Sequence, residues 1–209
     1  MQAAARHVHG SFAYLEIGSH LGGSLQTFMR DPACTAVLSI DPRPHDQPDA
    51  RGRRFTYEGN STERMLENLR ALAGVDLGKL TTFEAGTDEL DPAALPVRPQ
   101  VAFVDGEHTN EAALRDARFC ALAMHHEGCV LFHDAPIVRG AIEAFVDECE
   151  TFSAVALPNR MFLVELGPKR LLATEPLTAM CDESYRAYFK AMYELTRPRP
   201  GRWRRILRR

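Results

Sequence analysis

The chain has 209 residues, 45% of them hydrophobic and 25% charged, which fits one globular domain with short appendages and excludes fibrous or wholly disordered classes. No run approaches the ~18 apolar residues of a membrane span, and the first residues lack the apolar core of a secretory signal. The formal net charge of −3 conceals an acidic body with a basic end, because residues 197–209 hold seven arginines and no acidic residue.

Short apolar runs alternate with amphipathic helical patterns over most of the chain. Runs such as 36–41 and 129–134 are apolar on both faces, as expected where helices cover both sides of a parallel sheet. This order predicts an α/β fold, a doubly wound, Rossmann-like and mostly parallel seven-stranded sheet with an antiparallel C-terminal hairpin. The predicted strands are 13–18, 36–41, 80–86, 101–106, 129–134, 152–158 and 160–167, and the predicted helices are 24–30, 61–73, 110–126 and 138–148.

Two long irregular stretches, 42–54 and 88–100, interrupt this order, and loops of that length are usually functional or mobile. Whether 42–54 closes over a site stays open. We divide the chain into a catalytic domain over 1–174, a C-terminal helix within 175–196 and a basic tail over 197–209. The helix begins near Asp182 and carries an apolar stripe that we expect to dock on the domain, with a dimer contact or a substrate lid as alternatives (Tyr185, Tyr188, Phe189, Met192 and Leu195).

Carboxylates end four of the predicted strands: Glu16, Asp41, Asp105 and Asp134. In an open parallel sheet, ligands bind beyond the carboxyl ends of the strands. Gathered there, the four acids would repel one another and raise their pKa values unless a cation or a hydroxyl-rich ligand lay among them. The pattern therefore favours a ligand site over four unrelated caps.

The turn after the first strand reads EIGSHLGGS, residues 16–24. Its glycines, Gly18, Gly22 and Gly23, let a ligand approach the backbone. His20 stands where the dinucleotide fingerprint G-x-G-x-x-G needs its second glycine, so an NAD-binding turn fits poorly. Glu16, two residues before the first glycine, suits a ligand with an ammonium or sulfonium group.

Five segments together resemble the class I S-adenosylmethionine-dependent methyltransferases: EIGSHLGGS, SIDP, FEAGT, VAFVDGEHTNEAALRD and GCVLFHD. The D-G-x-H-[ST] and G-x-x-x-x-H-D pair is similar to a group that includes macrolide sugar O-methyltransferases and cephalosporin-hydroxylase-like proteins. The resemblance covers about residues 13–166. It implies an S-adenosylmethionine-dependent O-methyltransferase that acts on a hydroxyl of a small polar acceptor, a sugar or glycosylated metabolite, with help from a divalent cation.

The resemblance also implies roles for particular residues. Glu16, Gly18 and Ser19 would line the methionine part of the cofactor, and Gly22 belongs to the same cofactor-binding turn. Asp41 would accept the ribose hydroxyls, and Gly86 and Thr87 would border the adenine. Asp105, His133 and Asp134 would bind Mg²⁺ or Mn²⁺, although relatives often carry glutamate at the middle position, and an imidazole favours a softer ion.

His108 matches the general base of the sugar methyltransferases, and Asp105 shares the catalytic assignment with it. A histidine that titrates near 6.5 can remove a hydroxyl proton. The alternatives are that His108 caps the helix starting near Asn110 and that His133 forms a structural hydrogen bond. For the whole chain, the alternatives are a nucleotide-cofactor oxidoreductase on a similar fold and a non-catalytic scaffold tethered by its basic tail.

Cysteine usage and the tail bear on location. The five cysteines (34, 120, 129, 149 and 181) form no C-x-x-C pair, which argues against disulfides and structural zinc and for a reducing, cytoplasmic compartment. The tail fits a solvated end, peripheral contact with an anionic membrane surface or nucleic-acid binding, and the acidic body disfavours the last. A homo-oligomer stays open.

Overall fold

The computed structural model describes residues 1–150, 152–168, 171–175 and 177–180. The predicted helix from Asp182, its apolar stripe, Cys181 and the basic tail lie outside these residues. Within them, no helix is both long and apolar enough to cross a membrane. Cys120 and Cys129 are buried with free thiols, as the sequence predicts.

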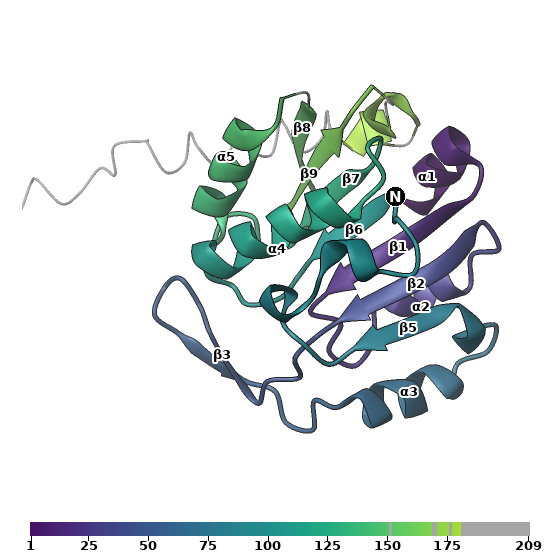
Figure 1. Ribbon diagram of the computed structural model, residues 1–209, viewed down its shortest axis with the longest axis vertical. Helices are drawn as coiled ribbons and strands as arrows, with labels where there is room; N and C mark the ends of the chain where they lie inside the picture. The colour runs from purple at the N-terminus through teal and green to yellow at the C-terminus, as the bar shows by residue number, and fades with distance from the viewer. Residues whose placement is uncertain (151, 169–170, 176, 181–209) are drawn as a thin grey trace, which may run out of the picture.

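One seven-stranded sheet organises the molecule, in the order β5-β2-β1-β6-β7-β9-β8 (Figure 1). The pairs among its first five strands are parallel, whereas β9 runs antiparallel to both β7 and β8. The predicted fold class is therefore confirmed, including the C-terminal hairpin. The strands are β1 (Phe12–Ile17), β2 (Cys34–Ile40), β5 (Leu80–Phe83), β6 (Val101–Val104), β7 (Cys129–Phe132), β8 (Phe152–Leu157) and β9 (Met161–Leu166).

Helices cover both faces of the sheet, because alternate strand residues point to opposite sides. On one side, Tyr14 joins a core with residues of α1, α2 and α3; on the other, Leu15 joins a core with residues of α4 and α5. The α-helices are α1 (Gln2–His9), α2 (Leu25–Met29), α3 (Thr62–Arg70), α4 (Asn110–Ala123) and α5 (Arg139–Glu148), and short 3₁₀ turns lie at Leu77–Lys79, Thr87–Glu89, Pro92–Ala94 and Leu171–Ala173.

Helices α3 and α4 begin within one residue of where the sequence predicts but end earlier. The Ser61 hydroxyl accepts from the Arg64 amide at 3.2 Å and caps the start of α3. The predicted ends are too late, since α3 stops at Arg70 and α4 at Ala123. His125 and His126 thus lie beyond α4, and their expected place in its last turn is wrong.

The stretch 42–54 is not irregular, because most of it belongs to a hairpin of β3 (Asp46–Pro48) and β4 (Arg54–Thr56). The hairpin projects from the end of the sheet toward which β1, β2 and β5 point (Figure 1). Its tip is fixed to another segment, since the Ala50 amide donates to the His108 carbonyl at 2.7 Å. We call residues 46–56 the β3–β4 hairpin.

Candidate active site

The first turn presses its backbone against the end of β6. Gly18 has φ +85°, and a Cβ at this position would lie 2.2 Å from the Asp105 carbonyl oxygen. Only glycine meets both conditions. Ser19 is buried beside it, and its hydroxyl accepts from Ser39 at 2.8 Å.

Gly22, also in the first turn, has a packing role in this structure. Its φ is +81°, and a Cβ there would meet the Met65 side chain at 3.0 Å and Leu69 close by. It lines neither of the two cavities described below. In this structure Gly22 lets α3 pack against the first turn.

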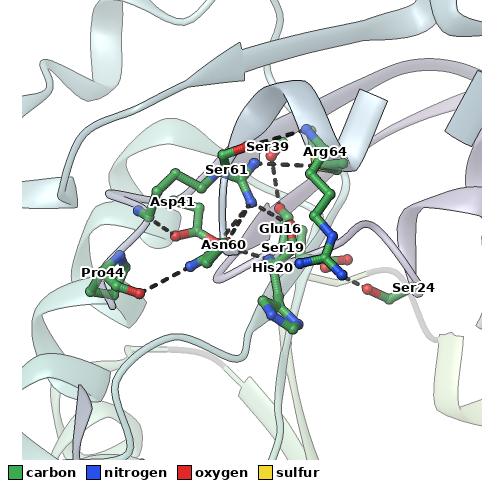
Figure 2. A network of polar contacts seen from close by, with 12 residues as sticks. Glu16, Ser19, His20, Ser24, Ser39, Asp41, Pro44, Asn60, Ser61 and Arg64 are labelled. Carbon is green, nitrogen blue, oxygen red and sulfur yellow. Dashed lines mark hydrogen bonds and ion pairs between the residues drawn. The ribbon is translucent and has the colours of Figure 1, made fainter. Parts of the chain in front are cut away.

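Glu16 is a buried carboxyl group in the penultimate residue of β1. Two hydroxyls donate to it: that of Tyr14 at 2.6 Å, and that of Ser24, which is labelled in Figure 2, at 2.5 Å. Burial raises the pKa of Glu16 to about 7, although these hydrogen bonds act in the opposite direction. A cation bound beside Glu16 would favour its charged form.

Asp41 follows β2 and faces the first turn, where Figure 2 shows it beside His20 and Asn60. Its carboxylate accepts from the His20 amide at 2.8 Å and from the Arg43 amide at 2.7 Å. The Arg43 guanidinium also donates to it at 3.2 Å. The predicted ribose acceptor is therefore held in one orientation by backbone and side chain together.

A cavity of about 250 Å³, which we call the acceptor cavity, opens beyond the strand ends. It brings together residues of the first turn, the ends of β2 and β6, the β3–β4 hairpin with the residues after it, and the segment after β7. Its lining residues are Gly18, His20, Asp41, Gln47, Tyr57, Asn60, Asp105, His108 and His133.

A second cavity of about 120 Å³, the adenine-side cavity, lies across Gly18, Asp41 and Gln47, which line both. Gly86 and Thr87, which the resemblance assigns to the adenine, line it. The buried Thr87 hydroxyl donates to Asp116 at 2.5 Å, and burial raises the pKa of Asp116. The two cavities thus meet at Asp41.

Three candidate catalytic residues converge in the acceptor cavity: Asp105, His108 and His133 offer ligand atoms within 4.8 Å of one another. Asp105 Oδ1 lies 2.9 Å from His133 Nδ1 and 3.5 Å from His108 Nε2. Burial would raise the pKa of Asp105, but the two histidines outweigh it and lower that pKa. In return, Asp105 raises the pKa of His133. Despite the short separation, the buried His133 Nδ1 is not aligned for a hydrogen bond.

Asp134 is not part of this three-residue group. Its backbone has φ +46°, and one carboxylate oxygen lies 3.0 Å from the guanidinium of Arg160, in the turn between β8 and β9. The other oxygen lies 3.6 Å from His108 Nδ1. His108 therefore stands between two carboxylates, one at each ring nitrogen.

The alternative role of His108 as a helix cap is wrong. Thr109 is the N-cap of α4, and its hydroxyl accepts from the Ala112 amide at 3.3 Å. His108 instead lines the acceptor cavity, where the hairpin tip holds its carbonyl.

Sequence reasoning missed Gln47, Tyr57, Asn60, Arg43 and Arg160. Gln47, Tyr57 and Asn60 follow no predicted sheet strand, and Arg43 and Arg160, although close to strand ends, are not acidic, so an argument from acidic strand ends could not find them. Tyr57 and Asn60 lie just before the N-cap of α3. This position is the one indication of a site role, because a segment that leads from the hairpin back to the sheet must cross the strand ends. Arg43 and Arg160 act through contacts that only the folded chain brings about.

Comparison with known proteins agrees with this geometry. A family model described as "Methyltransferase domain" matches residues 15–135, more than half of the chain. None of the curated proteins matches the sequence.

Solved structures share the fold at low identity. The O-methyltransferase TomG from Streptomyces achromogenes, involved in tomaymycin synthesis and solved with S-adenosylmethionine, is 14% identical with a TM-score of 0.56, covering 80% of this chain and 78% of its own. A protein from Staphylococcus aureus, provisionally assigned as a caffeoyl-CoA O-methyltransferase, is 11% identical with a TM-score of 0.58, covering 80% of both chains. The family match shows that the chain belongs to the class I S-adenosylmethionine-dependent methyltransferases, and the fold agrees with it.

Proposed function

We propose that the enzyme transfers a methyl group to a hydroxyl of a small polar acceptor, of the sugar or glycosylated-metabolite class, with help from a divalent cation. The observation that carries this proposal is one shared cavity. The acceptor cavity contains Gly18 and Asp41 on its cofactor side and the group Asp105, His108 and His133 on the other. A methyl donor and an acid–base centre can therefore meet in one cavity.

The lining of the acceptor cavity favours a sugar over a flat aromatic acceptor. Sites for aromatic ligands are lined mostly by apolar side chains. Among the described residues, no aliphatic side chain lines this cavity, and Tyr57 supplies its single phenyl ring. Carboxylates, imidazoles and amides instead match the many donors and acceptors of a polyol.

Asp105 and His133 fit a divalent cation. Their nearest atoms are 2.9 Å apart, and the buried His133 Nδ1 has no hydrogen-bond partner, so a ligand role would satisfy both groups. A mixed carboxylate and imidazole set suits Mn²⁺ or Fe²⁺ better than Mg²⁺. Bound there, a cation would lower the pKa of an acceptor hydroxyl.

His108 is then the general base, with Asp134 orienting it. The Asp134 carboxylate lies 3.6 Å from Nδ1 and would stabilise the imidazolium once Nε2, on the Asp105 side, has taken the hydroxyl proton. S-adenosylmethionine supplies the electrophilic methyl group when bound. Asp41 would then hold the cofactor's ribose, and the buried Glu16, which lines neither cavity, would balance the cofactor's positive charge from the end of β1.

The test is production of S-adenosylhomocysteine from S-adenosylmethionine with a panel of monosaccharide, glycoside and catechol acceptors, before and after EDTA treatment. We expect turnover with a sugar-type acceptor, loss of turnover in EDTA and recovery with Mn²⁺. Turnover of catechols alone would contradict the acceptor class. Turnover with none, together with thermal stabilisation by NAD⁺, would favour the oxidoreductase alternative, and stabilisation by S-adenosylhomocysteine without turnover would favour a scaffold.

Two variants separate the ligand from the base. His133→Ala should weaken Mn²⁺ binding, measured by calorimetry, by roughly 10-fold or more, because it removes one of two protein ligands. His108→Ala should lower kcat by roughly 10²- to 10⁴-fold while Mn²⁺ binds as before. Loss of Mn²⁺ binding in His108→Ala would make His108 a ligand and overturn its assignment as the base.

A further inference from the structure

Arg43 is an almost completely buried arginine under the junction of the two cavities. Its side chain is 7% exposed, and its backbone has φ +57°, a conformation that costs a non-glycine residue free energy. A guanidinium leaves water at considerable cost unless its donors find partners. The methyl-transfer reaction as proposed does not explain why this chain buries Arg43.

The guanidinium joins three segments that are distant in sequence. Nη1 donates to the His20 carbonyl of the first turn and to Asp41 at 3.2 Å. Nη1 also lies 3.5 Å from the Asn60 side-chain oxygen, and Nη2 lies 3.2 Å from the Met65 sulfur on α3. His20, Asp41 and Asn60 all line the acceptor cavity, so Arg43 ties together three parts of its wall.

The contacts on Asp41 leave little freedom to its carboxylate. Oδ1 accepts from the Arg43 amide at 2.7 Å, and Oδ2 accepts from the His20 amide at 2.8 Å and from Nη1. A carboxylate offers about four lone-pair directions. The remaining direction lies on Oδ1, which restricts how a ligand hydroxyl can reach Asp41 while Arg43 stays in place.

We infer that Arg43 is a positioning residue for recognition of the cofactor's ribose. It presents one oxygen of Asp41 in a fixed direction and holds the first turn beside it. This inference rests on the proposed role of Asp41 as the ribose acceptor, and it does not depend on the acceptor class or on the cation.

The experiment compares S-adenosylhomocysteine with its 2′-deoxy and 3′-deoxy analogues by calorimetry. In the unaltered protein, at least one deoxy analogue should bind roughly 10-fold more weakly or worse, because a hydrogen bond to a charged group is lost. Arg43→Met keeps the length of the side chain and the backbone bond to Asp41 but removes the guanidinium. In Arg43→Met we expect S-adenosylhomocysteine to bind only about 3-fold more tightly than the deoxy analogue, or less. Most of this change should come from weaker binding of S-adenosylhomocysteine itself.

Kinetics supply a second readout. Arg43→Met should raise the KM for S-adenosylmethionine while kcat at saturation stays within about 2-fold, since Arg43 lies outside the Asp105, His108 and His133 group. Arg64→Met is the matched control, because Arg64 is an exposed arginine of α3 whose side chain bonds the Glu58 carbonyl and not Asp41. It should change neither the preference nor the KM.

Two further variants keep the inference testable if Arg43→Met folds poorly. Arg43→Lys retains the buried charge with a single donor group and should give an intermediate preference. Asp41→Asn should abolish the preference, and adding Arg43→Lys to it should cause no further loss. If S-adenosylhomocysteine and both analogues lose affinity equally, Arg43 has only a structural role. If either Arg43 variant shows a larger preference for S-adenosylhomocysteine, then Arg43 competes with the ribose hydroxyls for Asp41. Either result overturns the inference.

If neither deoxy analogue binds more weakly to the unaltered protein, then Asp41 is not the ribose acceptor and the inference fails with it. Methyl transfer to a sugar could still be observed in that case. Conversely, a positive binding result would stand even if no acceptor in the panel were methylated. The two failures are therefore distinguishable.

Discussion

The two cavities are built in different ways. The cofactor side is made of strand ends and the first turn, where the hydrogen bonds of neighbouring parallel strands continue past the sheet, as from the Asp105 amide to the Ile17 carbonyl at 2.9 Å. The acceptor side is bordered by the β3–β4 hairpin, whose tip is held by the bond from the Ala50 amide to the His108 carbonyl, within a parallel bridge between Asp49 and His108, and by the Asp49–Arg51 pair. The strand ends on the cofactor side thus share a continuous ladder of backbone hydrogen bonds, whereas the hairpin, which also reaches the adenine-side cavity through Asp46 and Gln47, depends on a few contacts that substitution can remove one at a time.

The largest effect should come from breaking the cofactor side at Gly18. Gly18→Ala places a Cβ 2.2 Å from the Asp105 carbonyl oxygen at φ +85°, so the variant should lose about 3 kcal/mol or more of unfolding free energy. Gly10→Ala is the control, because Gly10 has φ +74° with nothing within 4 Å of a Cβ. It should lose about 1 to 2 kcal/mol. Equal losses in urea titrations would contradict the close approach.

The second prediction concerns the pH dependence that Glu16 imposes on the same side. Its pKa is about 7 when folded and 4.5 when exposed, so the folded state binds the extra proton. The stabilisation is complete below pH 4.5 and is lost as pH rises through 7. The unfolding free energy of the protein should therefore fall relative to Glu16→Gln by about 3 kcal/mol between pH 4.5 and 7.5. A constant difference across urea titrations at these pH values would refute the raised pKa.

The third prediction tests the hold of the hairpin on His108. The Asp49 side chain is buried and accepts from the Arg51 amide at 2.6 Å and from its guanidinium at 2.6 Å. Asp49→Ala frees the tip, so kcat should fall about 10-fold while S-adenosylhomocysteine binds as before. Arg53→Ala, at an exposed residue of the same hairpin that lines neither cavity, should leave kcat unchanged. Weaker binding of S-adenosylhomocysteine in Asp49→Ala would mean that the hairpin also supports the cofactor side.

The smallest effect should come from one hydroxyl on the acceptor side. Burial, with the Asp105, Asp134 and Asp41 carboxylates, raises the pKa of Tyr57, so its hydroxyl stays a donor. Tyr57→Phe should raise the acceptor KM about 3-fold without changing kcat. Phe55→Leu, at a 38% exposed hairpin residue that lines neither cavity, serves as the control in initial-rate measurements. A changed KM for S-adenosylmethionine in Tyr57→Phe would place this hydroxyl on the cofactor side.

The same contrast explains what the sequence could predict. The strands and the acidic strand ends follow from apolar runs and from the rule that ligands bind at the carboxyl edge, so Glu16, Asp41 and Asp105 could be found. The hairpin could not, because β3 and β4 have three residues each and no apolar alternation. The role of Arg43 could not be predicted either, because its partners lie 23 residues earlier, in the first turn, and 17 and 22 residues later in the sequence. The resemblance places the Asp134 carboxylate with Asp105 and His133 at a cation, but in the structure Asp134 has a positive φ and its carboxylate lies against Arg160.

The hairpin leaves and rejoins the body of the protein at nearly the same point, where the Tyr57 amide donates to the His45 carbonyl at 2.6 Å. Its tip, residues 49–53, can therefore be exchanged for a loop of another length without altering the path of the chain into α3. A new loop that restores the bond to the His108 carbonyl would let an engineer change the wall of the acceptor cavity while the strand ends keep their places.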